Sequence, residues 1–108
     1  MNDSIESSTQ VPRGPRRWLF LIHQIPPKPD YLRVKVRRRL QRIGAIPLKN
    51  SVYVLPETDD AREDFEWLLR ELMAEGGDGT ICTAQLLAGT DDGELEAAFR
   101  RESEAEYA

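Results

Sequence analysis

Residues 18–56 read WLFLIHQIPPKPDYLRVKVRRRLQRIGAIPLKNSVYVLP, and this segment sets the order of the elements. The run WLFLIHQ (18–24) is apolar at almost every position and prolines follow it, which predicts a buried strand with both faces covered. Residues 29–44 predict a helix, because Asp30 lies in the first turn and Gly44 stands where a helix would stop. The core face of this helix is expected to consist of Leu32, Val36, Leu40 and Ile43.

Outward from this segment, hydrophobic periodicity and glycine positions predict the remaining elements. They are strands at 45–48 and 51–55, a helix from 58 or 59 to about 75, a strand at 80–87 and a short acidic helix at 91–101. The order strand, helix, strand, strand, helix, strand predicts an α+β fold, a ferredoxin-like βαββαβ sandwich with an additional C-terminal helix.

The length of 108 residues suits one domain. We expect a disordered tail at 1–17, the domain at 18–89, and an acidic helix and tail at 90–108. Both long helices should cover one sheet face. The other face is also apolar, so the C-terminal helix or a second copy should cover it, which favours a homodimer.

Charge is strongly divided along the chain. Residues 13–49 carry eleven Lys and Arg against one acid, whereas residues 57–106 carry sixteen acids against four Arg. This split predicts a basic half that attracts an anionic partner or the acidic half of another copy. The alternative is two solvated helix faces that neutralise each other in the folded protein.

The basic half is centred on the predicted helix at 29–44. We single out Arg33, Lys35, Arg37, Arg38 and Arg42 as candidates for binding an anion or nucleic acid. Phosphate contacts need Lys and Arg without strict spacing, and arginine forks also suit an oxyanion such as chromate. The alternative is an amphipathic helix whose arginines pair with the acidic second helix. Arg39 lies near the core stripe and is expected to be structural.

Two further candidates flank the end of the first strand. His23 could bind an anion or titrate as a switch, and Lys28 in the following turn could complement an anion there. A hydrogen-bonded structural histidine is the alternative. The connection Lys49-Asn50-Ser51 could present polar groups to an anion, although Asn in such a turn more often serves the backbone conformation. Cys82 is interpreted as an inert small hydrophobe.

Trp67 and Val34 fall on the outward faces of the two helices. They predict a partner interface, where Trp is enriched, although scattered surface apolar residues are also common. No catalytic set, metal-ligand spacing or nucleotide loop is evident, so we expect no enzyme, no metal and no cofactor. No apolar run is long enough to cross a membrane and no secretory signal is visible, which predicts a cytoplasmic protein.

The segments 18–56, EDFEWLLREL (63–72) and the strand around Ile81-Cys82 resemble the N-terminal domain of the ChrB family. The resemblance covers roughly two thirds of the chain. It implies a role in bacterial chromate resistance, where ChrB is described as a chromate-responsive regulator of an efflux operon. Family members carry a separate C-terminal domain that this sequence does not contain. A partner chromate-sensing protein or domain is therefore also implied.

A looser resemblance extends to Cas2-like domains and the C-terminal part of PaaX-type repressors. Cas2-like nucleases place an Asp at the end of the first strand, where this sequence has His23-Gln24, so nuclease chemistry is disfavoured. We therefore expect a chromate-responsive transcription regulator that contacts promoter DNA. The alternatives are a non-enzymatic protein-interaction adaptor and, last, a metal-dependent nuclease.

Overall fold

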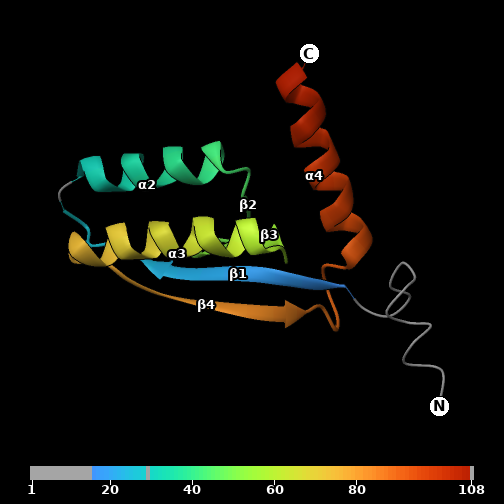
Figure 1. Cartoon of the computed structure of the whole chain (residues 1–108), viewed down its shortest axis with the longest axis horizontal. Coiled ribbons are helices and arrows are strands. Elements are labelled where there is room, and N and C mark those ends of the chain that lie inside the picture. Colours follow the sequence, from blue (N-terminus) through green and yellow to red (C-terminus); the bar gives the residue numbers. More distant parts are fainter. Residues whose placement is uncertain (1–15, 29, 108) are drawn as a thin grey trace.

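The structure, a computed structural model, describes residues 16–28 and 30–107. Its elements are β1 (Arg17–Gln24), α2 (Asp30–Arg42), β2 (Ile46–Lys49), β3 (Val52–Pro56), α3 (Asp59–Ala74), β4 (Asp78–Gln85) and α4 (Asp92–Tyr107) (Figure 1). The predicted α+β class and the predicted order of elements are confirmed, with α4 as the additional helix.

The strands form one antiparallel sheet in the order β2-β3-β1-β4. Leu21 of the central strand β1 lies opposite Tyr53 of β3 and Ile81 of β4. Strand β2 lies at an edge, where the missing N–H of Pro47 is tolerated, and its register shifts between Pro47 and Lys49. This arrangement is compatible with the predicted ferredoxin-like pattern.

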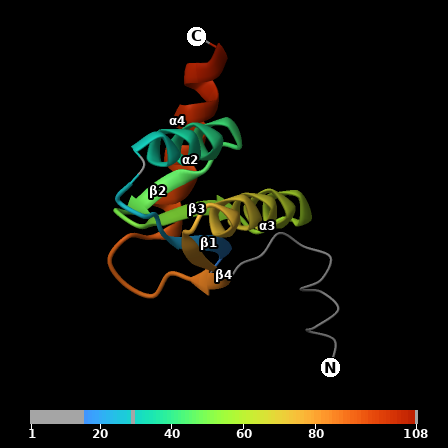
Figure 2. The ribbon, with the colours of Figure 1, turned by 90° about the vertical axis from the view of Figure 1, so that its left-hand side faces the viewer.

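Helices α2 and α3 cover the same face of the sheet (Figures 1 and 2). Alternation along β1 sends Leu19 and Leu21 into this layer. The main core is completed by Leu32, Val36 and Leu40 of α2 and by Ala61, Phe65, Leu68 and Leu72 of α3. Because each helix contributes one apolar stripe, its remaining surface is free to carry charge.

The opposite face of the sheet holds a smaller core in which Trp18 and Val54 pack against Leu95 of α4. The Trp18 ring stacks on Phe99 with centroids 5.8 Å apart. Coverage is partial, because Ile22 on this face stays 43% exposed. Leu95 and Phe99, in the first turns of α4, pack on this face. The helix then extends beyond the rest of the domain (Figures 1 and 2). The C-terminal helix therefore covers this face around Trp18 and leaves it partly uncovered around Ile22.

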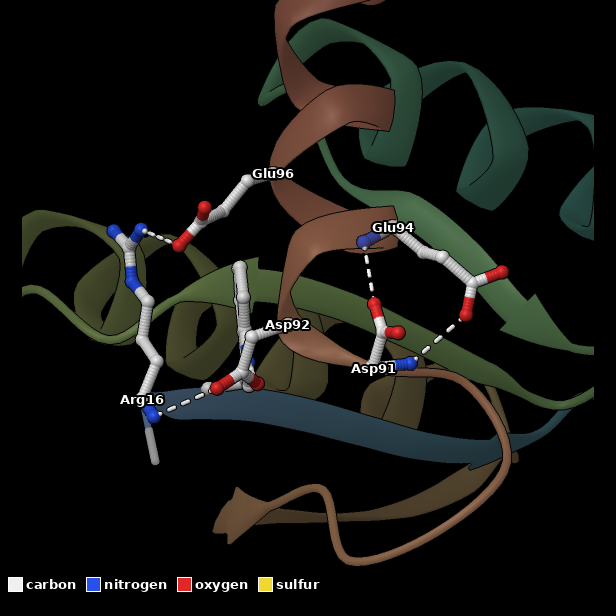
Figure 3. A network of polar contacts seen from close by, with 6 residues as sticks. Arg16, Asp91, Asp92, Glu94 and Glu96 are labelled. Carbon is white, nitrogen blue, oxygen red and sulfur yellow. Dashed lines mark hydrogen bonds and ion pairs between the residues drawn. The ribbon is translucent and has the colours of Figure 1, made fainter. Parts of the chain in front are cut away.

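Side chains define the start of α4 (Figure 3). Oδ1 of Asp91 accepts the backbone N–H of Glu94 at 2.8 Å, and Oε1 of Glu94 accepts that of Asp91 at 2.9 Å, which forms a capping box. The backbone N–H of Arg16 donates to Asp92 at 2.9 Å, and its guanidinium pairs with Glu96 at 3.0 Å. These contacts join the beginning of β1 to α4.

Several predicted boundaries are wrong by one to six residues. A tail was predicted at 1–17. Residues 1–15 lie outside the described residues, and Arg17 belongs to β1. Strand β4 begins at Asp78, two residues before the prediction, and Leu87 lies beyond it at 91% exposure. Glycine is generally disfavoured inside strands, yet Gly79 lies within β4 and is required there. A Cβ atom at Gly79 would lie 2.9 Å from the carbonyl oxygen of Ile22.

Candidate functional site

Helix α2 presents the predicted cluster of cations. Its buried residues are Leu32, Val36 and Leu40, so every cationic side chain except Arg39 lies on the exposed surface. Helix geometry divides these cations, because residues four apart share a face while neighbours diverge. Arg33 and Arg37 therefore point to one side of the core stripe, and Lys35, Arg38 and Arg42 project elsewhere.

Two of the cations form ion pairs with acids of α3 or its C-cap, which agrees with the alternative of a basic helix paired with the acidic second helix. Arg39 Nη1 lies 2.8 Å from Glu71 Oε1, with both side chains about 30% exposed. Lys35 Nζ lies 3.9 Å from Glu75 Oε2 at a more exposed position. The structural role expected for Arg39 agrees with this geometry. Among the residues that the structure describes, the other cations of α2 form no ion pair: Arg33, Arg37, Arg38 and Arg42.

A cavity of about 330 Å³ lies where α2 passes the end of β1 and the β2–β3 turn. Its charged and polar lining consists of His23, Gln24, Arg33, Arg37, Asn50, Ser51 and Tyr53. Ile25, Val36 and Leu40 supply its apolar surface. Within residues 16–28 and 30–107, no carboxylate lines this cavity. The structure thus brings together three of the sequence candidates, His23, Arg33 and Arg37.

The histidine is held by the turn that follows β2. Its backbone N–H donates to the carbonyl oxygen of Ser51 at 2.9 Å, and its Nδ1 lies 3.0 Å from the same oxygen. A carbonyl has no proton to give, so Nδ1 carries the hydrogen. The ring tilts against Tyr53 with centroids 5.5 Å apart. Burial lowers the pKa of His23 below 6.5, partly offset by the bond to Ser51.

Three groups of this cavity were discounted or missed in the sequence. Asn50 and Ser51 were interpreted as turn residues, and Tyr53 as a strand residue. Their signal was the register of the hairpin, because a tight β2–β3 connection must lie beside the end of β1. That signal becomes visible only once β3 is known to pair with β1.

Other candidates lie apart from this cavity. Lys28 is exposed in the bend before α2 and is not among the cavity residues. Val34 is 41% exposed on α2 and Trp67 is 55% exposed on α3, where Arg70 stacks 5.4 Å from its ring centroid. Within 16–28 and 30–107, no three His, Cys, Asp or Glu side chains form a metal-binding group. No helix in these ranges is both long and apolar enough to span a bilayer.

Comparison with known proteins agrees with the resemblance found in the sequence. The family described as "Protein ChrB, N-terminal" matches residues 33–108. "Protein ChrB" of Cupriavidus metallidurans is 25% identical over 95 residues, which cover 87% of this chain. The same alignment spans only 29% of that relative, so the match concerns one part of a longer protein. No solved structure matches the chain.

Proposed function

Since the chain belongs to the family of ChrB N-terminal domains, we propose that it is a regulatory module of bacterial chromate resistance that contacts promoter DNA through α2. The proposal includes a cytoplasmic location, a chromate-sensing partner protein or domain, and no catalytic role. The sign and position of the charges on α2 support it more than any other feature.

The observation that carries the DNA contact is the pair Arg38 and Arg42 on the solvent side of α2. Both are exposed, lie four residues apart, and form no ion pair within the described ranges. Arg33 and Arg37 extend the positive surface toward the cavity. A row of free arginines along one helix suits the phosphate backbone, which supplies most of the salt-dependent affinity for DNA.

The test is a titration of labelled chromate-operon promoter DNA and of scrambled DNA, at low and moderate salt, with and without chromate. We expect salt-sensitive binding to both and a preference for the promoter. The double variant Arg38→Gln/Arg42→Gln should flatten the slope of log affinity against log salt by about one for each lost phosphate contact. Absence of binding at low salt would refute the DNA contact.

The matched control for this experiment is Arg100→Gln/Arg101→Gln. It removes the same charge from exposed positions on α4. If it weakens binding as much as the α2 variant does, net charge accounts for the effect and α2 has no special place. If only the α2 variant weakens binding, the contact belongs to that helix.

A second candidate, a protein-interaction adaptor, rests on apolar surface. Trp67 and Met73 of α3 are each 55% exposed, and Val34 of α2 is 41% exposed. Partly bare apolar residues on the second sheet face, such as Ile22, also fit the homodimer we propose. Sedimentation should show a dimer that an Ile22→Asp variant weakens. A Trp67→Ala variant that leaves every association unaltered would count against the adaptor.

A further inference from the structure

Two cations line the cavity beside α2, and among the residues that the structure describes no acid lines it. Arg33 and Arg37 both line it, and within the described residues neither is neutralised by a carboxylate. Lys35 and Arg39 of the same helix are neutralised, by Glu75 and Glu71. Of the four arginines of α2 that form no ion pair within the described residues, Arg33 and Arg37 line the cavity, whereas Arg38 and Arg42 lie outside it. Such forks match the oxygen geometry of a multiply charged oxyanion.

Residues with neutral donors line the same cavity. Ser51 and Tyr53, which carry hydroxyl groups, and Asn50, which carries an amide, come from β3 and the turn before it. Val36 and Leu40, which are 4% and 0% exposed, contribute the adjoining apolar surface. A partly desolvated wall strengthens each charged hydrogen bond relative to one in open water. The cavity thus combines charge, neutral donors and reduced hydration.

His23 adds a donor that depends on protonation. With Nδ1–H committed to Ser51 O, the neutral ring has Nε2 only as an acceptor, and the protonated ring has Nε2–H as a donor. The groups around it are Tyr53 on β3, Arg33 and Arg37 of the same cavity, and Gly79 opposite it on β4. Asp78, next to Gly79, accepts the N–H of that glycine. A bound dianion would favour the protonated ring.

We infer that the cavity lined by His23, Arg33, Arg37, Asn50, Ser51 and Tyr53 binds one tetrahedral oxyanion dianion, of the chromate and sulfate class. The site deepens the proposed function, because it gives this regulatory module a class of small ligand. Only the choice of chromate as a probe rests on the proposed function. A phosphate of the DNA backbone has the same chemistry, so the experiment must separate a free oxyanion from DNA.

The first experiment is calorimetric titration of the full chain with sodium sulfate and with sodium chromate, against sodium chloride at equal ionic strength and without DNA. We expect saturable binding of one dianion per chain and none of chloride. Arg37→Gln and Arg33→Gln should each lower the affinity about tenfold or more, since each removes a charged hydrogen bond. The control Arg101→Gln, which removes a distant exposed charge, should change it less than twofold.

Weak, unsaturable heats that are equal in wild type and variants would overturn the site. So would a loss of affinity in Arg101→Gln equal to that in Arg37→Gln. Circular dichroism of each variant verifies folding, and both targeted arginines are exposed on α2, where glutamine is well tolerated. Amide resonances of Ser51 and Tyr53, followed by NMR during the sulfate titration, give a second readout. Shifts confined to other regions would also overturn the site.

The pH dependence tests the role of His23. Sulfate remains a dianion near neutral pH, so a rise in its affinity as the pH falls toward the lowered pKa of His23 reports on the protein. We expect this rise in wild type and its absence in His23→Asn, which keeps a donor near Ser51 O but does not titrate. Imidazole nitrogen shifts should show the ring gaining a proton when sulfate binds. A neutral ring in the bound state would exclude His23 as a ligand donor.

DNA binding is measured on the same samples in sulfate-free buffer. Saturable oxyanion binding without DNA binding would leave the site intact and refute the proposed DNA contact. DNA binding without saturable oxyanion binding would refute the site alone. DNA and sulfate could compete while Arg37→Gln weakens only the DNA complex. In that case the cavity binds a phosphate of the DNA backbone, and the inference of a free oxyanion fails.

Discussion

The indole Nε1 of Trp18 donates a 2.9 Å hydrogen bond to Oδ1 of Asp92, the first residue of α4. The other carboxylate oxygen accepts the backbone N–H of Arg16. These two hydrogen bonds lower the pKa of Asp92 below 3.8, and the bond from Trp18 has the larger effect. A carboxylate with a depressed pKa contributes stability above its unfolded pKa and loses it as the pH falls through the folded value. The attachment of α4 should therefore weaken in acid, below pH 3.8.

Replacing Asp92 by Asn tests this attachment. The amide oxygen still accepts a bond from Trp18 but carries no charge, so we expect a lower melting temperature near neutral pH. The variant should also lack the part of the acid-induced loss that occurs below pH 3.8. Trp18 fluorescence in a Trp67→Phe background measures both effects. A variant that shows the same acid profile as wild type would contradict the assignment.

His23 should make the fold less stable in mild acid. Burial lowers its pKa below 6.5, so the unfolded chain binds the proton more readily than the folded one. Stability is complete above pH 6.5 and falls as the pH drops through the folded pKa. Urea unfolding across this range, in sulfate-free buffer and on untagged protein, should show the decline. His23→Asn should be flat over the same interval, and since the chain has one His, no other imidazole can obscure the result.

The ion pair between Arg39 and Glu71 should support the fold and not the DNA contact. Both side chains are about 30% exposed and their closest atoms are 2.8 Å apart. We expect Arg39→Gln to lower the free energy of unfolding by about 1 kcal/mol. Its effect on the salt slope of DNA binding should be smaller than that of Arg38→Gln. The reverse ranking, measured by urea unfolding and DNA titration together, would assign Arg39 to the binding surface.

Two glycine substitutions should act in opposite directions. Gly79→Ala places a methyl group 2.9 Å from Ile22 O and 3.0 Å from Leu69 Cδ1, so we expect a loss of about 1–3 kcal/mol. Gly93→Ala in α4 meets only an ordinary contact at 3.5 Å and gains helix propensity, so it should stabilise by up to about 1 kcal/mol. Thermal unfolding measures both changes. Equal effects would mean that β1 and β4 can separate at little cost.

The core was predictable because it depends on local periodicity. Side chains alternate along a strand, so Trp18 and Leu19 lie on opposite sheet faces and belong to separate core clusters. The stripe of Leu32, Val36 and Leu40 likewise followed from 3.6-residue spacing. Boundaries were less predictable, because tertiary contacts decide them. Strand β4 extends to Asp78 only because Gly79 can approach β1 closely, which no local rule shows.

The candidate site was predictable in its residue types and not in its grouping. Arg33, Arg37 and His23 were each singled out, but nothing local places a strand end against the first turns of a helix. Asn50 and Ser51 enter the cavity through the pairing of β3 with β1, which joins residues about thirty positions apart. The separation of Arg39 from Arg38 likewise depends on where Glu71 of α3 lies.

Helix α4 is attached to the sheet near its N-terminal end, through Leu95 and Phe99. Its contacts with the sheet end near Phe99, and eight more residues carry the helix to Tyr107, about 12 Å farther at 1.5 Å per residue. A tilt of the helix by about 15° at Phe99 would move its C-terminal end by about 3 Å over that length. Small shifts of the Trp18 ring are therefore magnified at the far end of the helix.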